Sequence, residues 1–217
     1  MIRNIVWDVD GTLFDTYPAI ARSYQQAVND MGGDAPLDWI LQKARVTMSH
    51  CVAALVERCQ LDEVELVRKS DVYYDQISPK DQPPFPGVEA ICRYICSVGG
   101  KNLIVTHRGQ RGVDELLEAH KMTDLFSGCI TRDDGYPRKP DPAAFLATVK
   151  IYQLDRSETI NVGDREIDIL AGQGAGLFSC LFEPESVETA ADLIIRSYDD
   201  LLARLPTLNA TRGRQVP

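Results

Sequence analysis

Two aspartates near the start of the chain, Asp8 and Asp10, have the type and spacing for chemistry. They follow the apolar residues 5–7, which are typical of a buried strand. Because side chains alternate in an extended chain, the two carboxylates point the same way, and Gly11 then lets the backbone turn sharply. Like charges this close repel each other unless a cation or a proton intervenes. We therefore expect a site for a cation or for proton transfer here.

Four further polar groups stand at the ends of predicted elements. Thr106 and Asp164 each follow an apolar strand, Asp168 comes one helical turn after Asp164, and Lys139 immediately precedes a predicted helix. In a parallel α/β sheet, ligands bind beyond the C-terminal ends of the strands, where the strand order reverses. We therefore expect these groups to share one crevice with the aspartate pair.

The elements that must position these groups follow from hydrophobic periodicity. The pattern predicts strands at 2–8, 102–105, 128–130, 159–162 and 178–182, and an edge strand at 193–195. It predicts helices at 87–98, 110–120, 141–150, 166–173 and 199–205. Strands that alternate with helices in this way imply an α/β fold with a Rossmann-like, doubly wound parallel sheet and helices on both faces.

A helical insert interrupts this scheme after the first strand. Helical spacing begins at Tyr17 and recurs in several segments up to a proline-rich break at 79–86. We therefore divide the chain into an α/β core formed by 1–16 and 81–205, a helical domain at 17–80, and a flexible tail at 206–217.

Composition narrows the classes of partner. With 44% hydrophobic and 25% charged residues the chain is typical of a soluble globular protein, and its net charge of −9 argues against nucleic acid or an anionic membrane as partner. The six cysteines form no C-x-x-C pair. No signal peptide precedes Asp8 and no apolar run is long enough for a membrane span, so we expect a cytoplasmic location. The sequence leaves the oligomeric state open.

The acids favour magnesium. Asp8, Asp10 and Asp164 supply hard oxygen ligands, and neither histidine nor cysteine occupies these positions. Mg²⁺ is commonly bound by one or two carboxylates together with waters and a substrate phosphate, whereas zinc and copper prefer nitrogen or sulfur. We therefore expect Mg²⁺ as the cofactor.

The remaining groups favour a phosphorylated ligand. Lys139 and Thr106 offer donors to a multiply charged oxyanion, and free backbone N–H groups at Gly11 and Thr12 are expected to cradle it. His107 and Arg108 directly follow Thr106 and are candidates to contact the phosphate or the leaving group, although His107 could equally be solvated.

These groups together resemble the haloacid dehalogenase superfamily, whose four motifs occur in order over most of the chain. The matching residues are Asp8-x-Asp10-Gly11-Thr12, Thr106, Lys139-Pro140 and Gly163-Asp164-x-x-x-Asp168.

The resemblance implies a mechanism. Asp8 would attack phosphorus to form an aspartyl-phosphate, and Asp10 would protonate the leaving oxygen and later accept a proton from water. Mg²⁺ would lie between Asp8, the main-chain carbonyl of Asp10, Asp164 and a phosphate oxygen. Asp168 is a further candidate ligand, with hydrogen bonding in the helix turn as the alternative.

The resemblance also suggests a role for the insert at 17–80, which is similar to the four-helix type of cap that closes over the site. In relatives a cap loop contacts the substrate; here it would be 45–50, with Arg45 as the candidate contact. This loop lacks the glycine often found there.

The leading hypothesis is a magnesium-dependent phosphatase for a small phosphorylated metabolite, similar to phosphoglycolate phosphatases. A sugar phosphomutase similar to β-phosphoglucomutase is the alternative; Thr12 favours hydrolysis, because those mutases often carry valine there. A non-catalytic binding protein on the same fold is a third reading. A dehalogenase needs neither Asp10 nor Asp164, and phosphonate-cleaving relatives lack an aspartate at position 10, so both are disfavoured.

Overall fold

The computed structural model describes residues 1–182 and 189–208, and the chain divides into two units. One unit comprises Met1–Phe14 together with the described chain from Pro84 onward, and the other comprises Asp15–Pro83. The boundaries expected from the sequence lie within three residues of these limits. Of the expected flexible tail, residues 209–217 lie outside the described residues.

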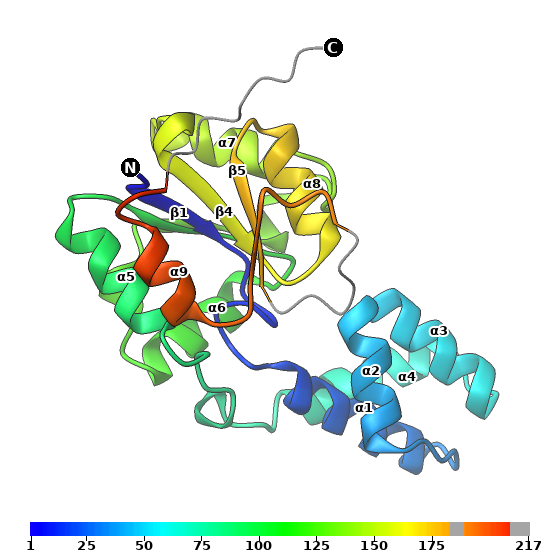
Figure 1. The fold of residues 1–217 in the computed structure, drawn as a ribbon. Helices are drawn as coiled ribbons and strands as arrows, with labels where there is room; N and C mark the ends of the chain where they lie inside the picture. Colours follow the sequence, from blue (N-terminus) through cyan, green and yellow to red (C-terminus); the bar gives the residue numbers. More distant parts are fainter. Residues whose placement is uncertain (183–188, 209–217) are drawn as a thin grey trace. The chain divides into compact units, whose positions relative to one another are not determined.

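The first unit is built on a six-stranded parallel sheet with the order β3-β2-β1-β4-β5-β6 (Figure 1). The strands are β1 (Asn4–Trp7), β2 (Asn102–Val105), β3 (Gly128–Ile130), β4 (Thr159–Gly163), β5 (Phe178–Phe182) and β6 (Leu193–Ile195). The chain order reverses at β1, where Val6 pairs with Leu103 of β2 and with Asn161 of β4. This switch point is where doubly wound sheets bind their ligands.

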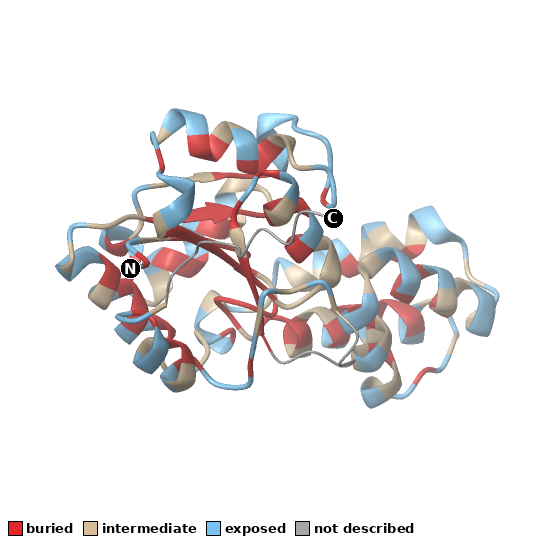
Figure 2. Ribbon diagram, turned by 45° about the horizontal axis from the view of Figure 1, so that its top comes forward, coloured by how far each residue is buried: buried red, intermediate tan, exposed pale blue. Residues whose placement is uncertain are grey.

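Helices cover both faces of the sheet, and the two cores explain why (Figure 1). On one face lie α5 (Val88–Ser97), α6 (Gln110–Ala119) and α9 (Tyr198–Arg204), and on the other lie α7 (Ala143–Ile151) and α8 (Glu166–Gly174). Within β1, Ile5 and Trp7 pack into the first core and Val6 into the second. A strand apolar on both faces must be covered on both. The strands accordingly form the buried centre of this unit (Figure 2).

The second unit consists of four helices with a hydrophobic core of their own. They are α1 (Tyr17–Asp30), α2 (Leu37–Val46), α3 (Met48–Cys59) and α4 (Glu63–Tyr74). α1 packs against α2 and α4, and α3 packs against the same two helices. Ile40, Leu55 and Leu66 are fully buried between them, and each such side chain contributes about 1.5–3 kcal/mol to folding.

The expected fold class is confirmed, and the element boundaries differ only locally. β1 is shorter than the expected 2–8. In the helical unit α4 begins at Glu63, because the Asp62 side chain caps it by accepting from the Glu65 N–H at 2.8 Å. Four short 3₁₀ turns complete the described structure: Pro79–Asp81, Thr123–Leu125, Arg132–Asp134 and Arg156–Glu158. Among the described helices, none has the length and apolarity needed to cross a membrane.

Candidate active site

The aspartate pair lies directly beyond β1, at the switch point of the sheet. The Asp8 N–H donates to the Val162 carbonyl of β4 at 3.0 Å, which extends the strand pairing by one residue. Gly11 then takes a left-handed conformation with φ of +76°, which allows the turn expected from the sequence. As a result the Asp8 side chain is 2% exposed, whereas that of Asp10 is 22% exposed. The two acids therefore differ in environment.

The loop after Asp10 closes on itself, which corrects one expectation. The Gly11 N–H donates to the Phe14 carbonyl at 3.0 Å, and the Thr12 N–H donates to the Val9 carbonyl at 3.3 Å. These two N–H groups were expected to be free for an oxyanion. They are used within the turn instead, because a tight turn must satisfy its own backbone donors.

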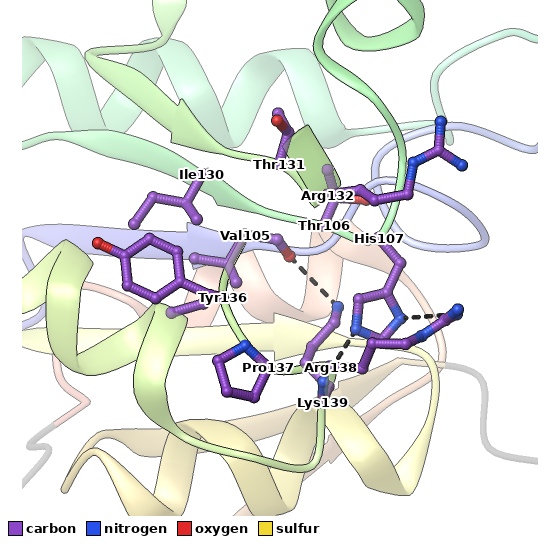
Figure 3. Close-up of a pocket in the computed structure, with 11 residues that line it drawn as sticks. Val105, Thr106, His107, Ile130, Thr131, Arg132, Tyr136, Pro137, Arg138 and Lys139 are labelled. Atoms are coloured by element: carbon purple, nitrogen blue, oxygen red, sulfur yellow. Dashed lines mark hydrogen bonds between the residues drawn. The ribbon is translucent and has the colours of Figure 1, made fainter. Parts of the chain in front are cut away.

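Lys139 connects the first motif to the last. Its Nζ lies 2.7 Å from Asp8 Oδ1 and 2.5 Å from Asp168 Oδ1, and it donates to the Val105 carbonyl at 3.2 Å. The lysine side chain is 2% exposed. Figure 3 shows its hydrogen bond to the Val105 carbonyl. Three acceptors therefore surround the buried ammonium group of Lys139 and fix its position.

The two carboxylates that share this ammonium group have pKa values shifted in opposite directions. Burial raises the pKa of Asp8, and attraction to Lys139 only partly opposes it. Burial acts in the same sense on Asp168, but Lys139 and Arg165 outweigh it and hold the pKa of Asp168 below its usual value. For Lys139, the two carboxylates outweigh burial and raise its pKa. Asp168 therefore compensates the lysine charge more fully, and Asp8 would gain more from a further cation.

The acids at the switch point fit a magnesium ion. Asp8, Asp164 and Asp168 each offer a carboxylate oxygen, and these oxygens lie within 4.8 Å of one another. Oδ2 of Asp8 is buried and has no hydrogen-bond partner among the described residues. A buried carboxylate oxygen without a donor is costly unless a cation compensates it. This orphaned oxygen and the all-oxygen donor set match the preferences of Mg²⁺.

Asp164 and Asp168 play different parts in this cluster. Asp164 Oδ1 accepts from the Thr12 hydroxyl at 3.4 Å. Asp168 forms an ion pair with Lys139 through Oδ1, and its Oδ2 accepts from the Arg165 N–H at 3.1 Å. The second contact is the helix-turn hydrogen bond considered as the alternative to metal binding.

Gly163 is required by the close approach of Asp168 to β4. A Cβ at Gly163 would lie 2.3 Å from the Cβ of Asp168, so any larger residue would displace the acid from Lys139. One helical turn further on, the Gly172 position lies against Asn161, whose amide donates to the Asp168 carbonyl at 3.1 Å. The glycine of the fourth motif therefore acts by letting α8 lie against the strand.

His107 joins the second motif to the third. Its Nε2 accepts from the Lys139 N–H at 2.9 Å, so the neutral ring carries its hydrogen on Nδ1 (Figure 3). Burial, with Lys139 and Arg138 nearby, lowers the pKa of His107 to about 4. Next to it, the Thr106 hydroxyl accepts from the Arg108 N–H at 3.2 Å.

A small pocket opens beside this junction (Figure 3). Its volume is about 50 Å³. Its lining includes His107, Ile130, Tyr136, Arg138 and Lys139. A single water needs roughly 10–15 Å³ by this kind of measure, so the pocket has room for a few waters but not for a nucleotide.

We predict that His107 makes the protein less stable in mild acid. Below pH 6.5 the unfolded chain binds a proton on His107, whereas the folded chain does so only near pH 4. The unfolded state binds more protons in this interval, so the free energy of unfolding falls as pH drops through it. Urea unfolding in chelator at pH 7, 6 and 5 should show a smaller loss for His107→Gln than for the wild type. An equal fall in the free energy of unfolding in the two proteins would contradict the lowered pKa of His107.

The expected site residues of the first unit lie together, and one expected residue belongs to the helical unit. Arg108 lies 2.5 Å from Asp10 Oδ1, within the same unit. Arg45 lies near the end of α2 in the helical unit, where its charge and that of Arg22 oppose the effect of burial on the pKa of Asp15. A contact between Arg45 and substrate stays a prediction.

Sequence reasoning missed Tyr198. Its buried hydroxyl donates to the Thr12 carbonyl at 2.7 Å, and its ring lies edge-on to Trp7 and stacked on Phe182. Tyr198 therefore anchors the loop that carries the aspartate pair. No local signal marks this residue, because the two partners lie 186 positions apart.

Taken together, the strand order and the acids beyond β1 and β4 define an α/β enzyme with its site at the topological switch point. The family model described as haloacid dehalogenase-like hydrolase matches residues 5–182. The chain belongs to this family.

Individual relatives agree with this assignment. The phosphoglycolate phosphatase of Aliivibrio fischeri is 31% identical over 188 residues, which cover 82% of this chain and 82% of the relative. A crystal structure named as a predicted phosphoglycolate phosphatase of Haemophilus somnus is 22% identical, covers 93% of this chain and 97% of its own, and has a TM-score of 0.81. One named as a β-phosphoglucomutase, from Thermotoga maritima, is 17% identical, covers 95% and 100%, and has a TM-score of 0.78. At these identities the two structures show the fold alone.

Proposed function

We propose that the protein is a magnesium-dependent phosphatase that hydrolyses a small phosphorylated metabolite through an aspartyl-phosphate, with 2-phosphoglycolate as the first substrate to test. One observation carries the proposal: Asp8 is buried with one oxygen against Lys139 and the other without a hydrogen-bond partner in the described structure. A carboxylate held in this way is oriented for attack and retains a site for a cation. Sequence similarity to phosphoglycolate phosphatases supports the choice of substrate.

We assign the metal to Asp8, Asp164 and the main-chain carbonyl of Asp10. Asp168, expected as a further ligand, forms an ion pair with Lys139 and accepts from the Arg165 N–H, and we assign it to holding Lys139. When bound, Mg²⁺ would neutralise charge on the phosphoryl oxygens and relieve the repulsion between the acids.

The chain's own residues perform the two chemical steps. A carboxylate oxygen of Asp8 attacks phosphorus, the bond from phosphorus to the leaving oxygen breaks, and that oxygen takes its proton from the Asp10 carboxyl group. Water then attacks phosphorus and gives a proton to Asp10, the bond to Asp8 breaks, and inorganic phosphate leaves. Asp10 is suited to proton transfer because its carboxyl group is the more exposed of the two.

The remaining residues bind and orient the phosphoryl group. Lys139 supplies positive charge beside Asp8, and we assign the Thr106 hydroxyl as a phosphate donor. His107 orients Lys139 by accepting a hydrogen bond from the Lys139 backbone N–H. We therefore assign His107 to positioning Lys139 rather than to contacting the substrate. Gly11 and Thr12 shape the loop, and Thr12 also holds Asp164. Arg45 is retained as a substrate contact, and the cytoplasm as the expected location.

Phosphate release from a panel of phosphorylated metabolites tests the function. We expect turnover of 2-phosphoglycolate with Mg²⁺, loss of activity to background in chelator, and recovery on adding Mg²⁺ back, because the acidic cluster needs the cation. β-Glucose 1-phosphate serves as the opposing substrate. Its conversion to glucose 6-phosphate without phosphate release would show a mutase, and no turnover of any compound would indicate a binding protein.

A further inference from the structure

We propose that Arg165 sets the Mg²⁺ affinity of the site: its guanidinium group competes with the metal ion for Asp164, so the protein binds Mg²⁺ more weakly than its acids alone would. This inference rests on the proposed function, which assigns Asp164 to the metal. It concerns a residue that fills an open position of the fourth motif, Gly163-Asp164-x-x-x-Asp168, and that the two chemical steps do not use.

Arg165 lies against both acids of this motif. Its Nε is 3.8 Å from Asp164 Oδ1, and its backbone N–H donates to Asp168 Oδ2 at 3.1 Å. The side chains of Arg165 and Asp164 are 15% and 10% exposed, so salt screens this ion pair only weakly. Since Mg²⁺ binds a carboxylate oxygen at about 2.1 Å, the guanidinium group lies only a few ångströms from a metal ion on Asp164.

The start of α8 is an unfavourable place for a positive charge. Arg165 immediately precedes this helix, whose dipole favours negative charge at its N-terminal end. Asp164 forms the ion pair with the arginine, and Asp168 accepts from its backbone. The positive charge is therefore held by the acids of the site and not by the helix.

The charge of Arg165 also acts on Asp8, the other carboxylate assigned to the metal. Burial raises the pKa of Asp8, and Lys139 and then Arg165 oppose this effect. Burial acts in the same sense on Asp168, where Lys139 and Arg165 together hold the pKa below its usual value. A cation that acts on Asp8 and Asp164 in this way repels a metal ion bound between them.

The charges at this edge of the sheet nearly balance without a metal ion. The contacts described above join four acids to three basic side chains: Asp8, Asp10, Asp164, Asp168, Lys139, Arg108 and Arg165. When all are ionised, the acids exceed the bases by one charge, and they exceed them by two if Arg165 is replaced by a neutral residue. Coulomb attraction for a divalent cation increases with the uncompensated charge, so such a variant should bind Mg²⁺ more tightly.

Calorimetric titration of Mg²⁺ into the metal-free protein tests the inference without substrate. For Arg165→Met, which keeps an apolar stem but removes the charge, we expect the dissociation constant for Mg²⁺ to fall about 10- to 100-fold. Arg165→Lys should stay within about threefold of the wild type, because lysine retains the charge. Arg93→Met is the matched control and should leave Mg²⁺ binding unchanged, since Arg93 is an exposed arginine of α5 paired with Glu89.

Urea unfolding gives a second readout that is independent of activity. A ligand that binds only the folded protein stabilises it by an amount that grows with its affinity. At one Mg²⁺ concentration, the rise in the unfolding midpoint relative to chelator should therefore be larger for Arg165→Met than for the wild type or Arg165→Lys.

An Arg165→Met variant that binds Mg²⁺ no more tightly than the wild type would overturn the inference. Equal tightening in Arg165→Lys would overturn it as well, because charge would then not be the cause. Failure of the proposed function gives a different result: a protein that shows the expected order of Mg²⁺ affinities but releases no phosphate from any compound would refute the phosphatase and support the role of Arg165.

Discussion

Replacement of Asp8 by asparagine is expected to lower kcat by roughly 10⁴-fold or more, as for other nucleophiles that act as part of a unit. The amide cannot form the phosphoester, and it also removes one of the charges that hold the cation. The fold should persist, because Lys139 keeps Asp168 as its buried partner at 2.5 Å. Phosphate release with Mg²⁺ measures the first effect, and urea unfolding measures the second.

The matched control for this variant is Asp124→Asn, a change of the same chemistry in an exposed 3₁₀ turn of the same unit. It should leave the rate unchanged. Acid-quenched mass spectrometry with p-nitrophenyl phosphate offers a direct test. The nitrophenolate leaves without a proton from Asp10, so Asp10→Asn should chiefly slow hydrolysis of the intermediate and leave one phosphoryl group on Asp8. Activity that persists in Asp8→Asn would refute the covalent mechanism.

Replacement of Lys139 by methionine is expected to abolish phosphatase activity and to lower the free energy of unfolding by about 3–5 kcal/mol, because it leaves buried carboxylates without their cation. The reason is the geometry around the ammonium, which compensates Asp8 and Asp168 together. Urea unfolding at pH 7 in chelator isolates this effect from any contribution of a bound metal. Lys150→Met, an exposed position on α7, serves as the control.

A double variant separates stability from catalysis. Adding Asp168→Asn to Lys139→Met removes one of the uncompensated charges, so part of the lost stability should return. Activity should not return, because the positive charge beside Asp8 is still missing. A double variant no more stable than Lys139→Met would mean that Lys139 stabilises the fold by packing rather than by charge.

The sequence by itself determined the elements and their order. Turns, strands and helices follow from local patterns: Gly11 allows the chain to reverse after Asp10, and the apolar run before Asp8 forms a strand covered on both faces. The motif residues could be placed at strand ends because a parallel sheet collects those ends at one edge. Local propensity and the parallel sheet that alternating strands and helices imply were enough to predict the elements and to place the motif residues at strand ends.

Only the tertiary structure decided how the charges at that edge are paired. Lys139 meets Asp8 across 131 positions and Arg108 meets Asp10 across 98. The N–H groups of Gly11 and Thr12 close the turn rather than remain free, and Asp168 turns to Lys139 and the Arg165 N–H. Which charge faces which depends on side-chain directions and burial, and spacing along the chain carries neither. For this reason the motifs predicted a magnesium phosphatase site with separate roles for Asp8 and Asp10, whereas the pairing of Lys139 with both Asp8 and Asp168 appears only in the assembled structure.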